Sequence, residues 1–190
     1  MSQTWNSVSG GNCSVAMALL HPKNPCLIVN TGGNLDEALN QIYELQKRRH
    51  TIIVLSSFQQ GYPTYYDYIK KEKLKPFYRS CNHKAKRQHM DRFFKAVAPV
   101  TVNIGLTKGE EGRAEAFNSN WKVRYRFPML SYTREQCEKI IRSKGMTPLE
   151  TRSGCYFCGK QPKSSWSWLK ENHPDKYQEC LDMGWHEEKS

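Results

Sequence analysis

Two short apolar runs on either side of one helical repeat place the strongest constraint on the fold of this chain. Residues 27–30 in "CLIVNTGG" and 51–55 in "TIIVLSS" are β-branched runs that end in small polar residues, as buried parallel strands do. Apolar residues recur at helical spacing across 35–45, with acidic residues early and basic residues late. The pattern predicts a strand–helix–strand unit.

The alternation continues along the chain. We expect helices over 64–73 and 85–97 and a third apolar strand over 100–106. A further helix is expected from Thr133, as N-cap of a capping box with Gln136, to a stop at Gly145. The sequence therefore predicts an α/β fold with a doubly wound, mainly parallel sheet and helices on both faces.

We expect a single domain over residues 1–190, because no low-complexity linker or internal repeat interrupts the chain. Within it, residues 1–130 are expected to form the α/β core. Residues 131–190 are expected to form a C-terminal helical segment that contains cysteines, with its last helix interrupted near Pro174.

Composition narrows the class of protein. Hydrophobic residues make up 38% of the 190 residues, and no apolar run approaches the roughly 20 residues that span a bilayer, so we expect a soluble protein without membrane contact. The N-terminus lacks the features of a secretory signal, which favours the reducing cytoplasm. The net charge of +11 favours a polyanionic partner or is simply a solvated basic surface, and both interpretations stay open.

A glycine-rich turn, "VSGGNCSV" at residues 8–15, precedes an apolar helical run. Gly10 and Gly11 permit backbone angles that other residues avoid, and the helix that follows would leave unpaired N–H groups at its start. Such a turn is a candidate anion site, although a Ser-Gly-Gly turn by itself is more often only a turn. The "NTGG" loop at 30–33 follows another strand end, and a plain strand-to-helix connection explains it equally well.

Two of the seven cysteines, Cys155 and Cys158, share a glycine-bounded turn whose spacing lets both thiolates reach one metal ion. Cys81 lies on a basic segment and is the best candidate for a third ligand. The fourth position is open among three residues, which are His83, Cys137 and Cys180. Alternatively, Cys155 and Cys158 are a redox pair, and Cys137 and Cys180 are core residues.

Six segments resemble, in the same order, the phosphoadenosine phosphosulfate (PAPS) reductase family within the adenine nucleotide alpha hydrolase superfamily. They are "SGGNCS", "VNTGGNLDEALNQIYEL", "RSCNHKAKRQHMDRFF", "NIGLTKGEEGRAEAF", "RFPMLSYTREQCEKII" and "GCYFCGKQPKSSWSWLKENHPDKYQECL". The resemblance covers nearly the whole chain. It implies a five-stranded parallel sheet that binds an adenine nucleotide across its carboxyl edge.

The resemblance also implies roles for individual residues. The phosphates would lie among Ser9, Gly10, Gly11, Asn12, Cys13 and Ser14. Thr31 and Gly32 would flank the nucleotide, and the charged positions would be Arg79, Lys86, Glu111 and Arg113. Lys86 and Arg113 would stabilise charge that develops on phosphate or sulfate. Relatives with cysteines at the positions of Cys81, Cys155 and Cys158 bind a 4Fe–4S iron–sulfur cluster or zinc.

The chain departs from the family pattern at three places. Cys13 stands where nucleotide-splitting members have an aspartate that helps to position magnesium, so a magnesium cofactor would bind here without that carboxylate. Ser80 and Cys81 replace the Cys-Cys pair of cluster-containing reductases. Glu179 and Cys180 resemble the start of the reductases' catalytic C-terminal motif, but no glycine follows.

Three functions are consistent with this pattern. The first is an ATP-dependent sulfurtransferase with a cysteine-bound metal centre, a nucleic acid as sulfur acceptor and a protein sulfur donor. The second is a reductase of adenylyl sulfate (APS) or PAPS, with Cys180 as nucleophile and a reductant protein as partner. The third is a nucleotide-binding module without catalysis. The oligomeric state is open, with a homodimer among the alternatives.

Overall fold

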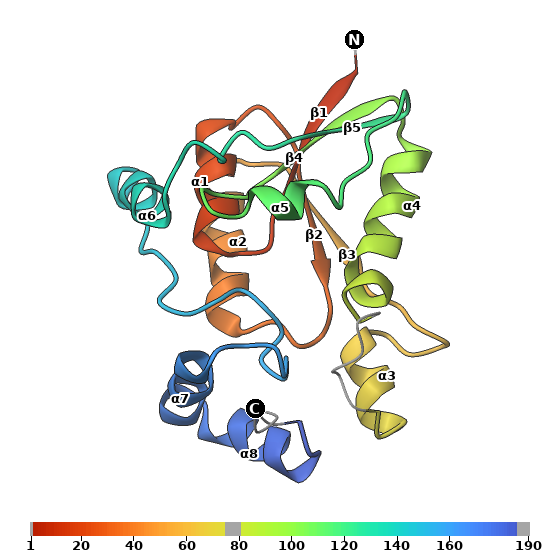
Figure 1. Ribbon diagram of the computed structural model, residues 1–190, viewed down its shortest axis with the longest axis vertical. Helices are drawn as coiled ribbons and strands as arrows, with labels where there is room; N and C mark the ends of the chain where they lie inside the picture. Colours follow the sequence, from red (N-terminus) through yellow and green to blue (C-terminus); the bar gives the residue numbers. More distant parts are fainter. Residues whose placement is uncertain (1, 75–80, 186–190) are drawn as a thin grey trace. The chain divides into compact units, whose positions relative to one another are not determined.

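The computed structural model describes residues 2–74 and 81–185. Five strands form one parallel sheet in the order β3-β2-β1-β4-β5 (Figure 1). The strands are β1 (Gln3–Ser7), β2 (Cys26–Asn30), β3 (Ile52–Ser56), β4 (Val100–Ile104) and β5 (Val123–Arg126). The predicted fold class, a doubly wound parallel sheet with helices on both faces, is confirmed.

The central strand β1 did not stand out in the sequence, because its segment "QTWNS" is mostly polar. The structure explains how such a segment lies at the centre of a sheet. Asn6 is fully buried, accepts a hydrogen bond from Nδ2 of Asn103 at 3.0 Å and donates one to the carbonyl of His21 at 3.3 Å. A buried amide with its hydrogen bonds made is tolerated at such a position.

The described residues divide into two compact units. The first, here the sheet unit, comprises residues 2–28, 36–55 and 91–150. The second, here the cysteine unit, comprises 29–35, 56–74, 81–90 and 151–185. The expected single domain, with its core ending at residue 130, stays a prediction.

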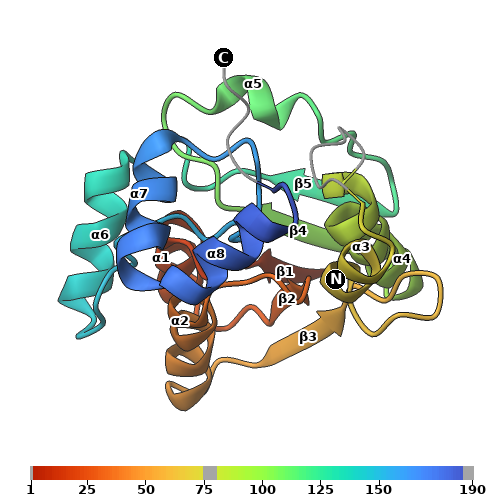
Figure 2. The same cartoon turned by 90° about the horizontal axis from the view of Figure 1, so that it is seen from below.

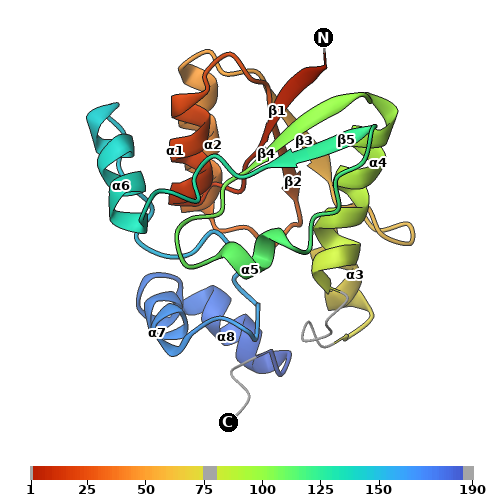
Figure 3. The ribbon, with the colours of Figure 1, turned by 45° about the horizontal axis from the view of Figure 1, so that its top comes forward.

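In the sheet unit, helices cover both faces of the sheet (Figure 3). One face carries α1 (Asn12–Leu20) and α2 (Asp36–Lys47), with α6 (Arg134–Ser143) packed against α1. An apolar cluster that includes Val15, Leu45 and Ile141 fills this side. On the other face lies α4 (Gln88–Ala96), whose two phenylalanines pack edge-on against Trp5.

The capping of α6 is as the sequence predicts. Thr133 accepts a hydrogen bond from the amide of Gln136 at 3.3 Å, and the Gln136 side chain accepts one from the amide of Thr133 at 2.7 Å. Gly145 follows the helix with a φ of +69°. Helix α6 therefore begins and ends where the local capping signals predict.

The cysteine unit is mostly helical and contains α3 (Tyr65–Lys71), the π-helical turn η1 (His83–Arg87), α7 (Lys163–Asn172) and α8 (Pro174–Asp182). Helices α7 and α8 lie side by side, joined near Pro174 (Figure 2). An aromatic-rich cluster, including Tyr65, Trp166 and Trp185, forms its core. No helix among the described residues is long and apolar enough to cross a membrane.

The packing of α6 predicts a stability effect. Ile141 is fully buried, whereas Lys139 on the same helix is exposed. Ile141→Ala should lower the free energy of unfolding by about 2–5 kcal/mol, because it removes buried methyl groups and leaves a cavity. Lys139→Ala should change it by less than about 0.5 kcal/mol. Urea unfolding followed by circular dichroism measures both, and equal losses would contradict the packing described.

Candidate functional site

The strand order creates a switch point between β1 and β4. From β1 the chain winds outward through β2 to β3, whereas β5 lies on the other side, next to β4. Loops that leave neighbouring strands in opposite directions open a crevice at the carboxyl edge, where ligands of such sheets bind. Here the two loops are the glycine loop (residues 8–14) and the loop after β4 (residues 105–110), and both belong to the sheet unit.

The glycine loop is held by contacts that require glycine. Gly10 has a φ of +80°, and a Cβ there would lie 2.1 Å from the carbonyl oxygen of Ala38. Ser14 braces the turn, since its hydroxyl accepts from the amide of Ser9 at 3.1 Å and donates to the carbonyl of Gly11 at 2.9 Å. Gly11 is the N-cap of α1 and supplies no side-chain cap. The first-turn amides of α1 are thus without the side-chain oxygen that usually satisfies them.

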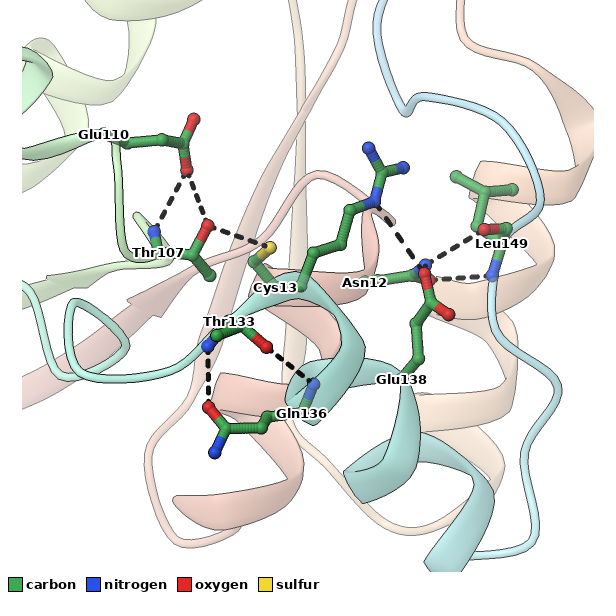
Figure 4. A network of polar contacts seen from close by, with 9 residues as sticks. Asn12, Cys13, Thr107, Glu110, Thr133, Gln136, Glu138 and Leu149 are labelled. Carbon is green, nitrogen blue, oxygen red and sulfur yellow. Dashed lines mark hydrogen bonds and ion pairs between the residues drawn. The ribbon is translucent and has the colours of Figure 1, made fainter.

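The loop after β4 comes close to the start of α1. A Cβ on Gly105 would lie 2.9 Å from Cα of Ser14. Thr107 is buried, and its amide and hydroxyl donate to Oε2 of Glu110 at 3.0 and 3.1 Å (Figure 4). Gly105, Thr107 and Glu110 were not predicted as site residues, although the Thr-x-x-Glu spacing in "LTKGE" is a signal for such a turn.

Asn12 holds the glycine loop in place. It is buried, and its Nδ2 donates to the carbonyl of Leu149 at 3.0 Å and to Oε1 of Glu138 at 3.2 Å. Its Oδ1 accepts from the amide of Leu149 at 2.7 Å (Figure 4). The side chain of Asn12 is therefore engaged within the protein and positions the loop.

Cys13, the next residue, has the properties of a reactive thiol. It is partly exposed, and its Sγ lies 3.8 Å from the hydroxyl oxygen of Thr107. A hydrogen bond from Cys137 lowers the pKa of Cys13 to about 7, with help from Thr107 and Arg134 and against the effects of burial and Glu110. A large fraction of Cys13 is therefore thiolate at neutral pH.

Charged groups surround these two loops. Burial raises the pKa of the Glu110 carboxyl, but hydrogen bonds from Thr107 and the charge of Arg113 outweigh it and leave the pKa below its ordinary value. Arg113 is exposed and forms an ion pair with Glu110. The pKa of exposed Glu111 is also lowered, by a hydrogen bond from the amide of Gly109. Arg134, at the start of α6, lies 3.8 Å from Glu138.

The remaining residues expected to bind the nucleotide belong to the cysteine unit or are not described. Thr31 is fully buried; its hydroxyl donates to Oδ1 of Asn34 at 3.0 Å and lies 3.1 Å from Sγ of Cys155. Gly32 is exposed, with a φ of +77°. Lys86 is partly buried in η1, and Arg79 lies outside the described residues.

The three expected metal ligands are neighbours within the cysteine unit. Burial raises the pKa of Cys81, and the nearby Cys158 and Cys155 raise it further. Cys155 and Cys158 share a tight turn, closed by a 3.1 Å hydrogen bond from the amide of Cys158 to the carbonyl of Cys155. Within residues 2–74 and 81–185, however, no group of three or more His, Cys, Asp or Glu side chains is arranged to hold a metal ion. The predicted metal site is not confirmed.

Cys180, expected as a nucleophile, lies in the core of the cysteine unit. It is fully buried, and burial followed by the charge of Glu179 raises its pKa to about 12. Glu179 itself accepts hydrogen bonds from Tyr66, Lys70 and Tyr156. A nucleophilic cysteine needs an accessible thiolate, and this environment opposes both access and ionisation.

No protein-family model and no curated protein matches the sequence. The fold does match a solved structure, a phosphoadenylyl-sulfate (PAPS) reductase from Candida auris in complex with phosphate. The two superpose with a TM-score of 0.59 at 12% sequence identity, over 78% of this chain and 75% of that one. This chain has a PAPS reductase-like fold.

The geometry of the glycine loop predicts an unusual cost at Gly10. Gly10→Ala should destabilise the protein by at least about 2 kcal/mol more than Gly145→Ala. Both glycines have positive φ, so each alanine adds backbone strain of about 1–2 kcal/mol, but the nearest atom to a Cβ on Gly145 is 3.8 Å away. Urea unfolding of the two variants tests this, and equal stabilities would show that Ala38 does not confine the loop.

The environment of Cys13 predicts a pH-dependent reaction. Because its pKa is about 7, alkylation of Cys13 by iodoacetamide should reach half its maximal rate near pH 7. Cys180, with a pKa of about 12, should stay unmodified in the folded protein at that pH. Peptide mapping by mass spectrometry measures both rates. An inflection for Cys13 near pH 9, the ordinary thiol value, would contradict the hydrogen bonding described.

Proposed function

We propose that this protein binds an adenine nucleotide of the sulfonucleotide class, APS or PAPS, with its phosphates at the glycine loop. One observation carries the proposal: the start of α1, without a side-chain cap, lies at the switch point of a PAPS reductase-like sheet. A helix N-terminus of this kind favours a phosphate through its amides and its dipole. The similar reductase, solved with phosphate, supports the choice of ligand class.

The local order of the loop supports binding without rearrangement. Gly10 and Gly105 allow the close approaches that shape the loop, and Asn12 ties it to Leu149. Loop geometry that is set before the ligand arrives lowers the entropic cost of binding. In this proposal the amides of Cys13 and Ser14 contact phosphate, and the side chains of Asn12 and Ser14 position them.

Cationic side chains contribute charge to the same site. Arg134 acts on Cys13 electrostatically, so its guanidinium is within range of an anion at the start of α1. Arg113 belongs to the loop after β4, where its ion pair with Glu110 reduces its net contribution. The charge of +11 on the whole chain would raise the local concentration of anionic ligands.

Two reactions expected from the sequence remain candidates with less support. Reduction of the sulfonucleotide by Cys180 is opposed by the burial of this thiol, so we assign Cys180 no step. The ATP-dependent sulfur transfer that the sequence analysis expected, to an acceptor such as nucleic acid, would use a thiolate-bound metal centre. Cys81 has Cys155 and Cys158 as neighbours, but no group of three or more His, Cys, Asp or Glu among the described residues is arranged to hold a metal ion. We therefore propose nucleotide binding, and derive no step through an iron–sulfur cluster, zinc or magnesium.

Isothermal titration with APS, PAPS and ATP tests the proposal. Arg134→Ala should weaken binding of the preferred nucleotide roughly fivefold, about 1 kcal/mol, because it removes a cation near the phosphate. Arg142→Ala, an exposed substitution in the last turn of the same helix, should leave the affinity unchanged. Failure of both APS and PAPS to bind would overturn the proposal, whatever the result with ATP. Assays for released sulfite and released pyrophosphate then distinguish reduction of the sulfonucleotide, ATP-dependent sulfur transfer and binding without turnover.

A further inference from the structure

Two cysteines face each other where α1 packs against α6 in the sheet unit. Cys137, in the first half of α6, is fully buried in the apolar cluster against which Cys13 packs. Cys13 packs against this cluster from α1, and a hydrogen bond between the two thiols acts on the pKa values of both, so the two side chains are neighbours. Cys13 is partly exposed and therefore accessible to a small reagent, whereas Cys137 is not.

The two thiols have opposite acid–base properties. Cys13 has a pKa of about 7. The pKa of Cys137 is well above the ordinary thiol value, first because Cys137 is hydrogen-bonded to Cys13 and then because it is buried. The charged groups that face the pair are Glu110, Arg134 and Glu138. Such an arrangement provides one accessible thiolate and, in contact with it, one protonated thiol. This is the combination that a peroxide-reactive cysteine and its resolving partner require.

We propose that Cys13 and Cys137 form an oxidisable thiol pair that closes to an intramolecular disulfide when the glycine loop holds no anion. The oxidant is hydrogen peroxide or an organic hydroperoxide. This pair is separate from the Cys155–Cys158 pair of the cysteine unit, and it lies at the glycine loop, where the phosphates of the proposed nucleotide would bind. The dependence on an empty loop rests on the proposed function, whereas the pairing of the two thiols does not.

The chemistry balances in two steps. The Cys13 thiolate attacks one peroxide oxygen, the O–O bond breaks, and hydroxide leaves and takes up a proton, so that Cys13 becomes a sulfenic acid. The Cys137 sulfur then attacks the Cys13 sulfur, the S–O bond breaks, and the Cys137 proton leaves with the hydroxyl group as water. Overall, two thiols are oxidised to one disulfide while hydrogen peroxide is reduced to two molecules of water.

A bound phosphate would suppress the first step. Cys13 is the second residue of α1, so its sulfur and a phosphate at the glycine loop compete for the same positive end of the helix. A nearby negative charge disfavours ionisation of a thiol and raises its pKa. The anion also covers the approach to the sulfur. Oxidation would therefore report an empty site.

Peptide mapping after exposure to hydrogen peroxide tests the pair in the full chain. Trypsin releases Cys13 in the peptide 1–23 and Cys137 in the peptide 135–139. We expect these two peptides joined, two hydrogens lighter than their sum, and separated by dithiothreitol. A saturating concentration of PAPS should slow formation of the joined peptide at least tenfold. Cys137→Ala should abolish it, whereas Cys26→Ala, which removes another buried cysteine, should not.

Each other outcome decides part of the proposal. Oxidation of Cys13 without the joined peptide would overturn the pairing. A joined peptide that forms equally fast with PAPS, in protein that binds PAPS by titration, would overturn the dependence on an empty loop. If the reduced protein binds none of the three nucleotides but still forms the joined peptide, the proposed function fails and the thiol pair stands.

Discussion

The close approach of Gly10 to the carbonyl of Ala38 determines where the glycine loop lies. This contact leaves no room for a side chain at Gly10. Gly105 makes a second such approach, to the backbone of Ser14. Two backbone contacts of this kind, together with the hydrogen bonds of Asn12 to Leu149, hold the start of α1 at the switch point. The candidate anion site is a consequence of that packing.

The seven cysteines separate into different chemical environments once the chain is folded. Cys26 and Cys180 are buried, and burial raises the pKa of both thiols. Cys81 lies near Cys155 and Cys158 in the cysteine unit. Among the described residues, no group of three or more His, Cys, Asp or Glu is arranged to hold a metal ion. Cys13, at the start of α1, has a pKa of about 7, below that of an ordinary thiol. A partly exposed thiol with a lowered pKa therefore lies where the fold also presents helix amides.

Local patterns predicted much of the fold. The apolar runs of β2 and β4 and the helical repeat of α2 have the periodicities that their positions require. The run of β3 predicted a strand but not its burial, because β3 lies at the edge of the sheet and Val54 is 58% exposed. The capping box of α6 is a local signal as well, and it was predicted residue by residue. Strand β1 was missed because Asn6 is buried by pairing with Asn103, which is distant in sequence. Short-range hydrophobicity carries no information about such a partner.

The sequence by itself determined the strand and helix segments, the glycine turn and the order of the motifs, because these depend on neighbouring residues and on backbone preference. Only the tertiary structure decided which side chains are available for chemistry. Thr31 and Asn12 were expected from the sequence to bind the nucleotide, but the fold engages their side chains with Cys155 and Leu149. Cys13 and Cys137 carry no joint signal along the chain, and they become a pair because α1 and α6 pack together. Burial and hydrogen bonding between distant residues set ionisation and access, and these properties exist only in the folded protein.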